Sequence, residues 1–153
     1  MQDTVALSTS GIVVKGSEVL LVRHTYGAAK GQILIPGGNI QSGEMPEQAV
    51  LREIFEETQV HAEVSGLYAV RFRPANWWAI FSLRYVAGTP VADGHETDLA
   101  YFLNIKDAIG LPELAETSRF LLQRFSSSCQ KSLSPINFKP TMHSNEGWAL
   151  YSL

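Results

Sequence analysis

The stretch that decides the fold runs from Gly38 to Val60 and reads GNIQSGEMPEQAVLREIFEETQV. Glu53, Glu56 and Glu57 stand at i, i+3 and i+4, so their carboxylates project from one helix face within about one turn. Like charges at this spacing cost roughly 0.2–0.5 kcal/mol per pair, and only Arg52 lies within the same turns to offset them. A divalent cation is the natural counter-charge. Oxygen ligands without a nearby His or Cys cluster favour magnesium, with manganese as the alternative, over zinc.

A solvated helix face is the competing interpretation of these carboxylates. A helical wheel places Leu51, Ile54, Phe55 and Thr58 on an apolar side, and the three glutamates roughly opposite, with Ala49 and Val50 among them. A purely solvated face usually carries Lys four residues after each Glu, and this stretch has none. The sequence therefore favours a metal site.

The same segment resembles the Nudix box, the signature G-x5-E-x7-R-E-U-x-E-E-x-G-U of the Nudix hydrolases, in which U is a bulky aliphatic residue. The matching positions are Gly38, Glu44, Arg52, Glu53, Ile54, Glu56, Glu57 and Val60. The late glycine of the signature is Gln59 here, and residues 35–38 read IPGG where the family usually has LPGG. The chain is identified as a MutT-like, single-domain member of this family. A glutamine in the place of a helix-ending glycine puts the end of the helix in doubt, but not the ligands, which all precede it.

The resemblance implies an α+β fold, the Nudix-type α/β/α sandwich with a mixed β-sheet. Hydrophobic patterning predicts strands at residues 5–14, 18–24, 62–72, 77–86 and 99–103, a short extended segment at 31–35 that a glycine turn closes, and helices at 46–58 and 113–125. We expect the Nudix domain to span residues 1–125. Residues 126–153 form a polar connector and an apolar tail, which we expect to dock on the domain or on the partner of a homodimer.

The activity implied by the resemblance is Mg²⁺-dependent hydrolysis of a diphosphate bond in a nucleoside diphosphate linked to a group X, by attack of a metal-activated water on phosphorus. The implied catalytic residues are Glu53, Glu56, Glu57 and Glu96. The implied metal ligands are Gly38, Glu53, Glu56 and Glu57. Supporting positions are Gly37, Glu44 and Arg52. The general base stays open between a box glutamate and Glu96, which lies in the loop ADGHETD at residues 92–98 and has a plain surface loop as its alternative.

Substrate-binding candidates are basic and aromatic residues near strand ends: Arg23, Arg71, Arg73 and Trp77. Arg23 comes first, since an Arg at the end of the second strand often lines the family's pocket. Pro74 lies 15 residues beyond Gln59, a spacing that resembles ADP-ribose-type members of the family. Because turns recruit proline in any case, nucleoside triphosphates remain equally open as substrates.

Composition limits the classes of partner. The chain has 153 residues and a net charge of −3, which suits one globular domain and gives no general attraction to nucleic acid or to anionic membranes. Its single cysteine, Cys129, excludes an internal disulfide, and no apolar run approaches the ~18 residues of a membrane span. The first ten residues lack the pattern of a secretory signal, so we expect a cytoplasmic protein whose partner is a small nucleotide.

Two other functions compete with the hydrolase. A non-catalytic module could keep the fold to sense a nucleotide, but it would have no need of all four box glutamates and Arg52. An enzyme that acts on RNA ends would be expected to carry a basic stripe, which this acidic chain lacks.

Overall fold

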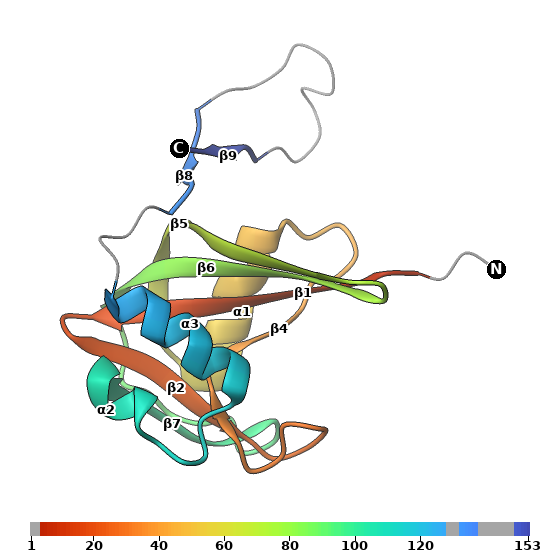
Figure 1. The fold of residues 1–153 in the computed structure, drawn as a ribbon. Coiled ribbons are helices and arrows are strands. Elements are labelled where there is room, and N and C mark those ends of the chain that lie inside the picture. Colours follow the sequence, from red (N-terminus) through yellow and green to blue (C-terminus); the bar gives the residue numbers. More distant parts are fainter. Residues whose placement is uncertain (1–3, 128–131, 138–148) are drawn as a thin grey trace.

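The computed structural model describes residues 4–127, 132–137 and 149–153, which form a mixed sheet with helices on both faces (Figure 1). Its elements are β1 (Ala6–Lys15), β2 (Glu18–His24), β3 (Ile33–Leu34), β4 (Gly37–Asn39), α1 (Pro46–Thr58), β5 (His61–Arg73), β6 (Asn76–Ala87), β7 (Thr97–Asn104), α2 (Ile105–Ile109), α3 (Glu116–Ser127), β8 (Ser134–Pro135) and β9 (Tyr151–Ser152). Cys129 and part of the predicted connector lie outside the described residues. Within the described ranges, no helix is both long and apolar enough to cross a membrane.

The main sheet has seven strands, in the order β3-β2-β1-β6-β5, with β4 paired to β1 and β7 paired to β2. Strands β1 and β6 are parallel and the other pairs are antiparallel. Strands β1 and β2 pair at Val14–Val19 and Lys15–Glu18, at the predicted hairpin. Further back along β1, strand β4 takes the place of β2, pairing with residues 8–10. Along this edge, β1 therefore pairs first with β4 and then with β2.

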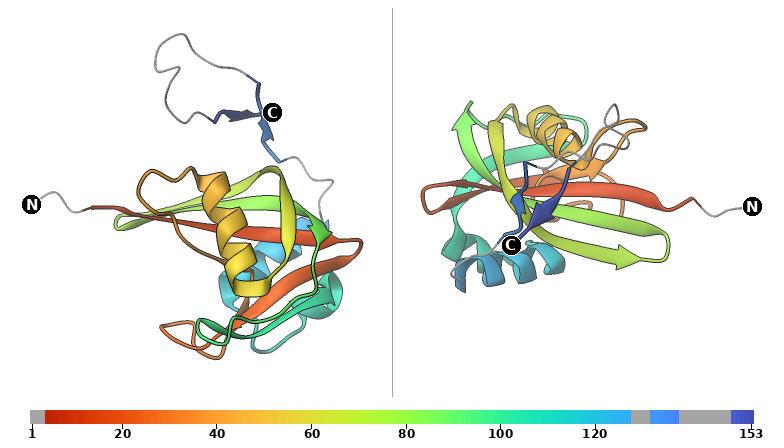
Figure 2. Two further views of the ribbon diagram at one scale, coloured as in Figure 1. Left: turned by 180° about the vertical axis from the view of Figure 1, so that it is seen from behind. Right: turned by 90° about the horizontal axis from the view of Figure 1, so that it is seen from above.

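Two apolar layers cover the sheet. Helix α1 packs on one face around Val50, Ile54 and Phe81, and α3 packs on the other around Ile12, Ile80 and Leu122. The left view of Figure 2 shows α1 in front of the sheet and α3 behind it. The predicted α/β/α sandwich with a mixed sheet is confirmed.

Three local predictions need correction. The expected glycine turn after residue 35 is strand β4, because its backbone pairs with β1. Residues 113–115 are not helical: Glu113 lies in a turn and Leu114 forms a bridge with Ile33, whose N–H donates to the Glu113 carbonyl and whose carbonyl accepts the Ala115 N–H. Helix α2 was not predicted; its first turn is capped by the Asn104 side chain, which accepts the N–H of Lys106.

The chain returns to the sheet after α3. Leu133 and Leu67 exchange both backbone hydrogen bonds, and a Cβ at Gly66 would collide with the Leu133 carbonyl, so glycine is needed for this approach. Further on, the ring of Tyr151 packs edge-on against Phe81, and its hydroxyl donates to Glu47 Oε2 at 2.5 Å. The described tail thus contacts the start of α1.

Candidate active site

Helix α1 turns two of its carboxylates toward the sheet. Its buried residues are Ala49, Val50, Glu53, Ile54, Glu57 and Thr58, whereas Phe55 is 39% exposed. The predicted apolar side is confirmed at Ile54 and Thr58 and wrong at Phe55, whereas Glu53 and Glu57, predicted on the other side with Ala49 and Val50, are buried. The small residue Gly11 on β1 lets Val50 and Ile54 approach the sheet closely, since a Cβ there would meet both of them. This close approach brings the carboxylates one turn later into the layer between helix and sheet.

Strand β4 meets these carboxylates with two glycines. The N–H of Gly37 donates to Glu57 Oε2 at 2.9 Å. A side chain at Gly38 would collide with the carboxyl group of Glu53, and one at Gly37 would collide with β1. Glycine at both positions is therefore a steric requirement for bringing the β4 backbone against the carboxylates.

Arg52 binds the neighbouring acidic groups in what we call the Arg52 network. Its guanidinium donates to Glu44 at 2.7 and 2.9 Å, to Glu53 Oε1 at 2.7 Å, to Glu56 Oε2 at 3.1 Å, and to the Asn39 carbonyl at 3.1 Å. The hydrogen bonds from Arg52, with the backbone N–H of Gln41, lower the pKa of Glu44 to about 2. The same carboxylates raise the pKa of Arg52. One cation thus fixes the loop before α1 to the helix and screens its acidic face.

The loop before β7 supplies a further carboxylate. Asp93 Oδ1 accepts the backbone N–H groups of His95, Glu96 and Thr97 at 2.9–3.0 Å, which folds the loop around one oxygen. The Thr97 hydroxyl, fully buried, donates to the carbonyl of Glu57 at 3.2 Å. These bonds tie Glu96 to the end of α1, although it lies 39 residues further along the chain.

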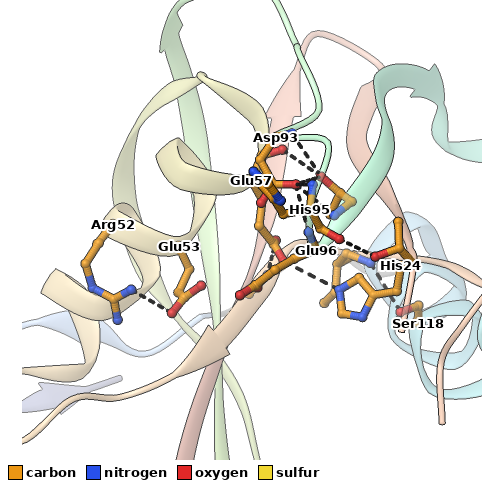
Figure 3. A network of polar contacts seen from close by, with 12 residues as sticks. His24, Arg52, Glu53, Glu57, Asp93, His95, Glu96 and Ser118 are labelled. Carbon is orange, nitrogen blue, oxygen red and sulfur yellow. Dashed lines mark hydrogen bonds and ion pairs between the residues drawn. The ribbon is translucent and has the colours of Figure 1, made fainter. Parts of the chain in front are cut away.

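Three carboxylates converge at this point. Glu53, Glu57 and Glu96 each offer one oxygen within 4.8 Å of the others (Figure 3). Burial raises the pKa of both Glu53 and Glu57. Arg52 opposes this rise at Glu53, whereas His24 and the Gly37 N–H oppose it at Glu57. Glu56 is not part of this group: its side chain is 55% exposed and turns to Arg52. The structure therefore brings together three of the four predicted catalytic residues.

The sequence did not point to one neighbour of this group, His24. Its Nε2 lies 3.4 Å from Glu57 Oε1, in what we call the buried pair, with side chains 15% and 2% exposed. A register shift between Arg23 and His24 ends the regular pairing of β2 with β7 and pairs His24 with Thr97. The alternation of Leu20, Val22 and His24 along β2 was the available signal, because it places the histidine on the α1 side of the sheet.

The predicted substrate-binding residues lie apart from the carboxylates. Arg23 forms a two-pronged ion pair with Asp98, at 2.7 and 3.1 Å, on the exposed surface. Arg71 stacks on Trp78, 5.0 Å from its ring centroid, and donates to Asn76. Trp77 is 50% exposed and meets Phe72 edge-on near the tip of the β5–β6 hairpin, where Arg73 is also exposed. Among the hydrogen bonds, ion pairs and ring contacts of the described residues, the partners of this set do not include Glu53, Glu57 or Glu96.

Known proteins resemble the chain in sequence and fold. The family model described as NUDIX domain matches residues 6–125. The chain is 31% identical over 115 residues to the ADP-ribose pyrophosphatase of Methanocaldococcus jannaschii, covering 72% of this chain and 66% of that protein. It is 25% identical over 132 residues to the NAD-capped RNA hydrolase NudC of Pseudomonas syringae pv. syringae, covering 82% of this chain and 45% of that protein. The chain thus spans less than two thirds of the length of these relatives.

Solved structures support the same fold. A NUDIX hydrolase from Nitrosomonas europaea superposes with a TM-score of 0.71 at 18% identity, covering 82% of this chain and 72% of that chain. An ADP-ribose pyrophosphatase from Streptococcus suis superposes with a TM-score of 0.65 at 21% identity, covering 83% of this chain and 96% of that one. At such identities the likeness establishes the fold and leaves the substrate open.

Proposed function

The chain belongs to the NUDIX family, and on this premise we propose that it is a divalent-metal-dependent pyrophosphohydrolase acting on a small nucleotide. The observation that carries the proposal is the convergence of Glu53, Glu57 and Glu96, with one oxygen of each within 4.8 Å of the others. Three carboxylates at this separation repel one another unless a cation lies among them.

The residues present fit a hard cation. All three groups are carboxylates, and Oε1 of the almost fully buried Glu57 has no hydrogen-bond partner. A buried, unpartnered carboxylate oxygen is costly, and a divalent ion supplies the missing contact. Oxygen donors favour Mg²⁺, with Mn²⁺ as the alternative. We therefore propose that Glu53, Glu57 and Glu96 would hold the cation and that the Gly38 carbonyl and Glu56 would serve as further oxygen ligands.

The residues divide the work of the reaction between them. A bound Mg²⁺ would neutralise phosphate oxygens and acidify a water molecule. Glu96 would accept the proton of the attacking water, because its loop is fixed by Asp93 while its side chain stays exposed. Arg52 would orient Glu53 through its hydrogen bond. Gly37 would orient Glu57 in the same way.

The part of the nucleotide that lies away from the diphosphate has a candidate binding surface on β6. Ser8 on β1 pairs with Asn39 on one side and with Trp78 on the other, so Trp78 lies two strand spacings, roughly 10 Å, from the end of β4. The Arg71–Trp78 stack offers a flat apolar surface and a cation at this distance. Because relatives carry the names ADP-ribose pyrophosphatase and NAD-capped RNA hydrolase, we propose a diphosphate that joins two groups, such as ADP-ribose, before a triphosphate.

The test is chromatographic turnover on a panel of ADP-ribose, sugar nucleotides, dinucleoside polyphosphates and nucleoside triphosphates with Mg²⁺. The wild type is compared with Glu53→Gln and with Glu63→Gln as a matched control. Glu63 lies on the edge strand β5, where its exposed side chain pairs with Arg84 of β6. We expect the Glu53 variant to lose at least ~100-fold in turnover and the control to be unchanged. A wild type that cleaves nothing while one nucleotide raises its melting temperature would identify a nucleotide-sensing module instead.

A further inference from the structure

Glu57 has the least exposed carboxylate of the three glutamates that converge at the site. Its side chain is 2% exposed. Oxygen Oε2 accepts the Gly37 N–H at 2.9 Å, but Oε1 has no hydrogen-bond partner. The group that faces Oε1 is Nε2 of His24 at 3.4 Å, which is also buried and without a hydrogen-bond partner. Two unpaired buried polar atoms that face each other require a physical explanation.

The orientation of the His24 ring is fixed from several sides. Its backbone N–H donates to the Gln32 carbonyl at 3.2 Å, and its carbonyl accepts the Gly31 N–H at 2.8 Å. The ring stacks on that of Tyr26, with centroids 5.8 Å apart and planes within 8° of parallel. Two hydrogen bonds from residue 25, Thr25 N–H to the Glu96 carbonyl and Thr25 Oγ1 to the His95 carbonyl, hold the following residue to the Glu96 loop. The imidazole is therefore held against Glu57 by the fold itself.

The histidine lies beside the metal-ligating group rather than in it. The residues whose ligand atoms all lie within 4.8 Å of one another are Glu53, Glu57 and Glu96, and His24 does not belong to that set. Ligands of a single ion at ~2.1 Å lie no further apart than about twice that distance, so His24 faces one ligand from outside. An imidazole N–H next to a metal-bound carboxylate is a recurrent supporting contact.

We propose that His24 is a positioning residue that orients Glu57 for cation binding through Nε2 and Oε1. With the Gly37 N–H on the other oxygen, it holds the plane of the carboxylate and leaves further lone pairs for a cation. At 3.4 Å the contact is long for an N–H···O bond, and active-site hydrogen bonds of this length commonly tighten when a ligand binds. The inference rests on the proposed function only for the cation site, not for hydrolysis.

The test measures Mn²⁺ binding directly, by electron paramagnetic resonance of the free ion, with the full chain and without nucleotide. His24→Phe keeps the ring that stacks on Tyr26 and removes the donor, whereas His24→Gln keeps an N–H donor. His61→Phe is the matched control, since His61 is exposed and packs on the outer side of α1 against Phe55. We expect the dissociation constant for Mn²⁺ to rise about 10- to 100-fold in His24→Phe, to recover at least partly in His24→Gln, and to be unchanged in the control.

Other outcomes would overturn the proposal. An unchanged Mn²⁺ affinity in His24→Phe, in a protein that melts at the wild-type temperature in EDTA, would show that the imidazole merely fills space. Spin-echo modulation from a nitrogen directly coordinated to Mn²⁺ in the wild type, absent in His24→Phe, would make His24 a ligand instead. A wild type that binds no Mn²⁺ would overturn both this inference and the proposed metal site. Normal binding without turnover on any nucleotide would overturn hydrolysis alone.

Discussion

Glu53 and Glu57 lie one turn apart on α1 and approach the same point near Glu96, yet they have different kinds of neighbour. Glu53 belongs to the Arg52 network, in which a full positive charge binds its carboxylate at 2.7 Å. Glu57 belongs to the buried pair, where a neutral backbone N–H and an imidazole are its partners. Burial raises the pKa of both, but only Glu53 has a guanidinium to offset it.

This difference indicates that the Arg52 network and the buried pair have different tasks, although both involve carboxylates of α1. The hydrogen bonds of the Arg52 network form without a metal, so the network can hold the loop, α1 and β4 together before any ligand arrives. The buried pair leaves a carboxylate oxygen and a ring nitrogen unpaired. The network therefore builds the site, and the buried pair is the part that a cation completes.

The largest effect on the free energy of unfolding should come from Arg52→Gln. This change removes the cation that binds three carboxylates, and leaves Glu53 buried without its counter-charge. We expect a loss of about 2 kcal/mol in the free energy of unfolding, discounted for the partial exposure of Arg52, and a 10- to 100-fold loss of turnover. Urea unfolding in EDTA and steady-state kinetics measure the two.

For the buried pair, the comparison predicts a smaller loss of stability in the metal-free protein than for the Arg52 network. His24→Phe should lower the free energy of unfolding in EDTA less than Arg52→Gln does, because it keeps the ring and removes one long contact to Glu57 rather than the cation that binds three carboxylates. If Arg52→Gln and His24→Phe destabilised the metal-free protein equally, the division between the network and the buried pair would be wrong.

Asp93→Ala tests how Glu96 reaches the other two carboxylates. Asp93 Oδ1 accepts three backbone N–H groups of the loop. Their loss should lower turnover about 10-fold and the free energy of unfolding by about 1 kcal/mol, measured by kinetics and thermal melting. Asp107→Ala on the exposed part of α2 serves as a control. A variant with wild-type turnover would show that Glu96 has no part in the chemistry.

Tyr151→Phe examines a third carboxylate of α1, Glu47, at the opposite end of the helix. We propose that the described tail docks on the domain through Tyr151, which donates to Glu47 and packs on Phe81. The variant keeps the ring and loses the hydrogen bond, so we expect a loss of about 1 kcal/mol in stability at unchanged turnover. Thermal melting with light scattering checks it. A change in mass instead would indicate docking on a second subunit.

The stability contributions of Glu44, in the Arg52 network, and of Glu57, in the buried pair, should change with pH in opposite directions. The pKa of Glu44 is lowered to about 2 by Arg52, so its contribution is present above pH 4.5 and is lost as pH falls through about 2. Burial raises the pKa of Glu57, so the metal-free fold loses stability as pH rises from 4.5 through that raised value. Thermal melting in EDTA compares wild type with Glu57→Gln and Glu44→Gln. Curves for Glu57→Gln and wild type that stay parallel above pH 4.5 would contradict this account.

The sequence predicted what depends on local spacing and missed what depends on strand pairing. Helix α1 was predicted over its full length, and the box placed Arg52 beside its acidic partners, because both follow from the 3.6-residue period. The wheel could not say which side of α1 would be covered, since Gly11 on β1 decides how the helix sits. His24 was missed for a related reason: alternation places it on the α1 side of the sheet, but its contact with Glu57 depends on how α1 packs against the end of β2.

Gln59→Gly should have the smallest effect, although this position is the one departure from the box. Gln59 has the left-handed conformation that the glycine of the signature would adopt, with φ of 60°, and its N–H and its side-chain amide both donate to the Phe55 carbonyl. Glycine would relieve about 1 kcal/mol of backbone strain, but it would lose the side-chain hydrogen bond and gain entropy in the unfolded chain. These terms nearly cancel, so urea unfolding should detect a change below about 1 kcal/mol, with turnover equal to that of the wild type. A large loss of turnover would mean that the end of α1 controls the carboxylate of Glu57 two residues earlier, and that the buried pair depends on the helix cap as well as on His24.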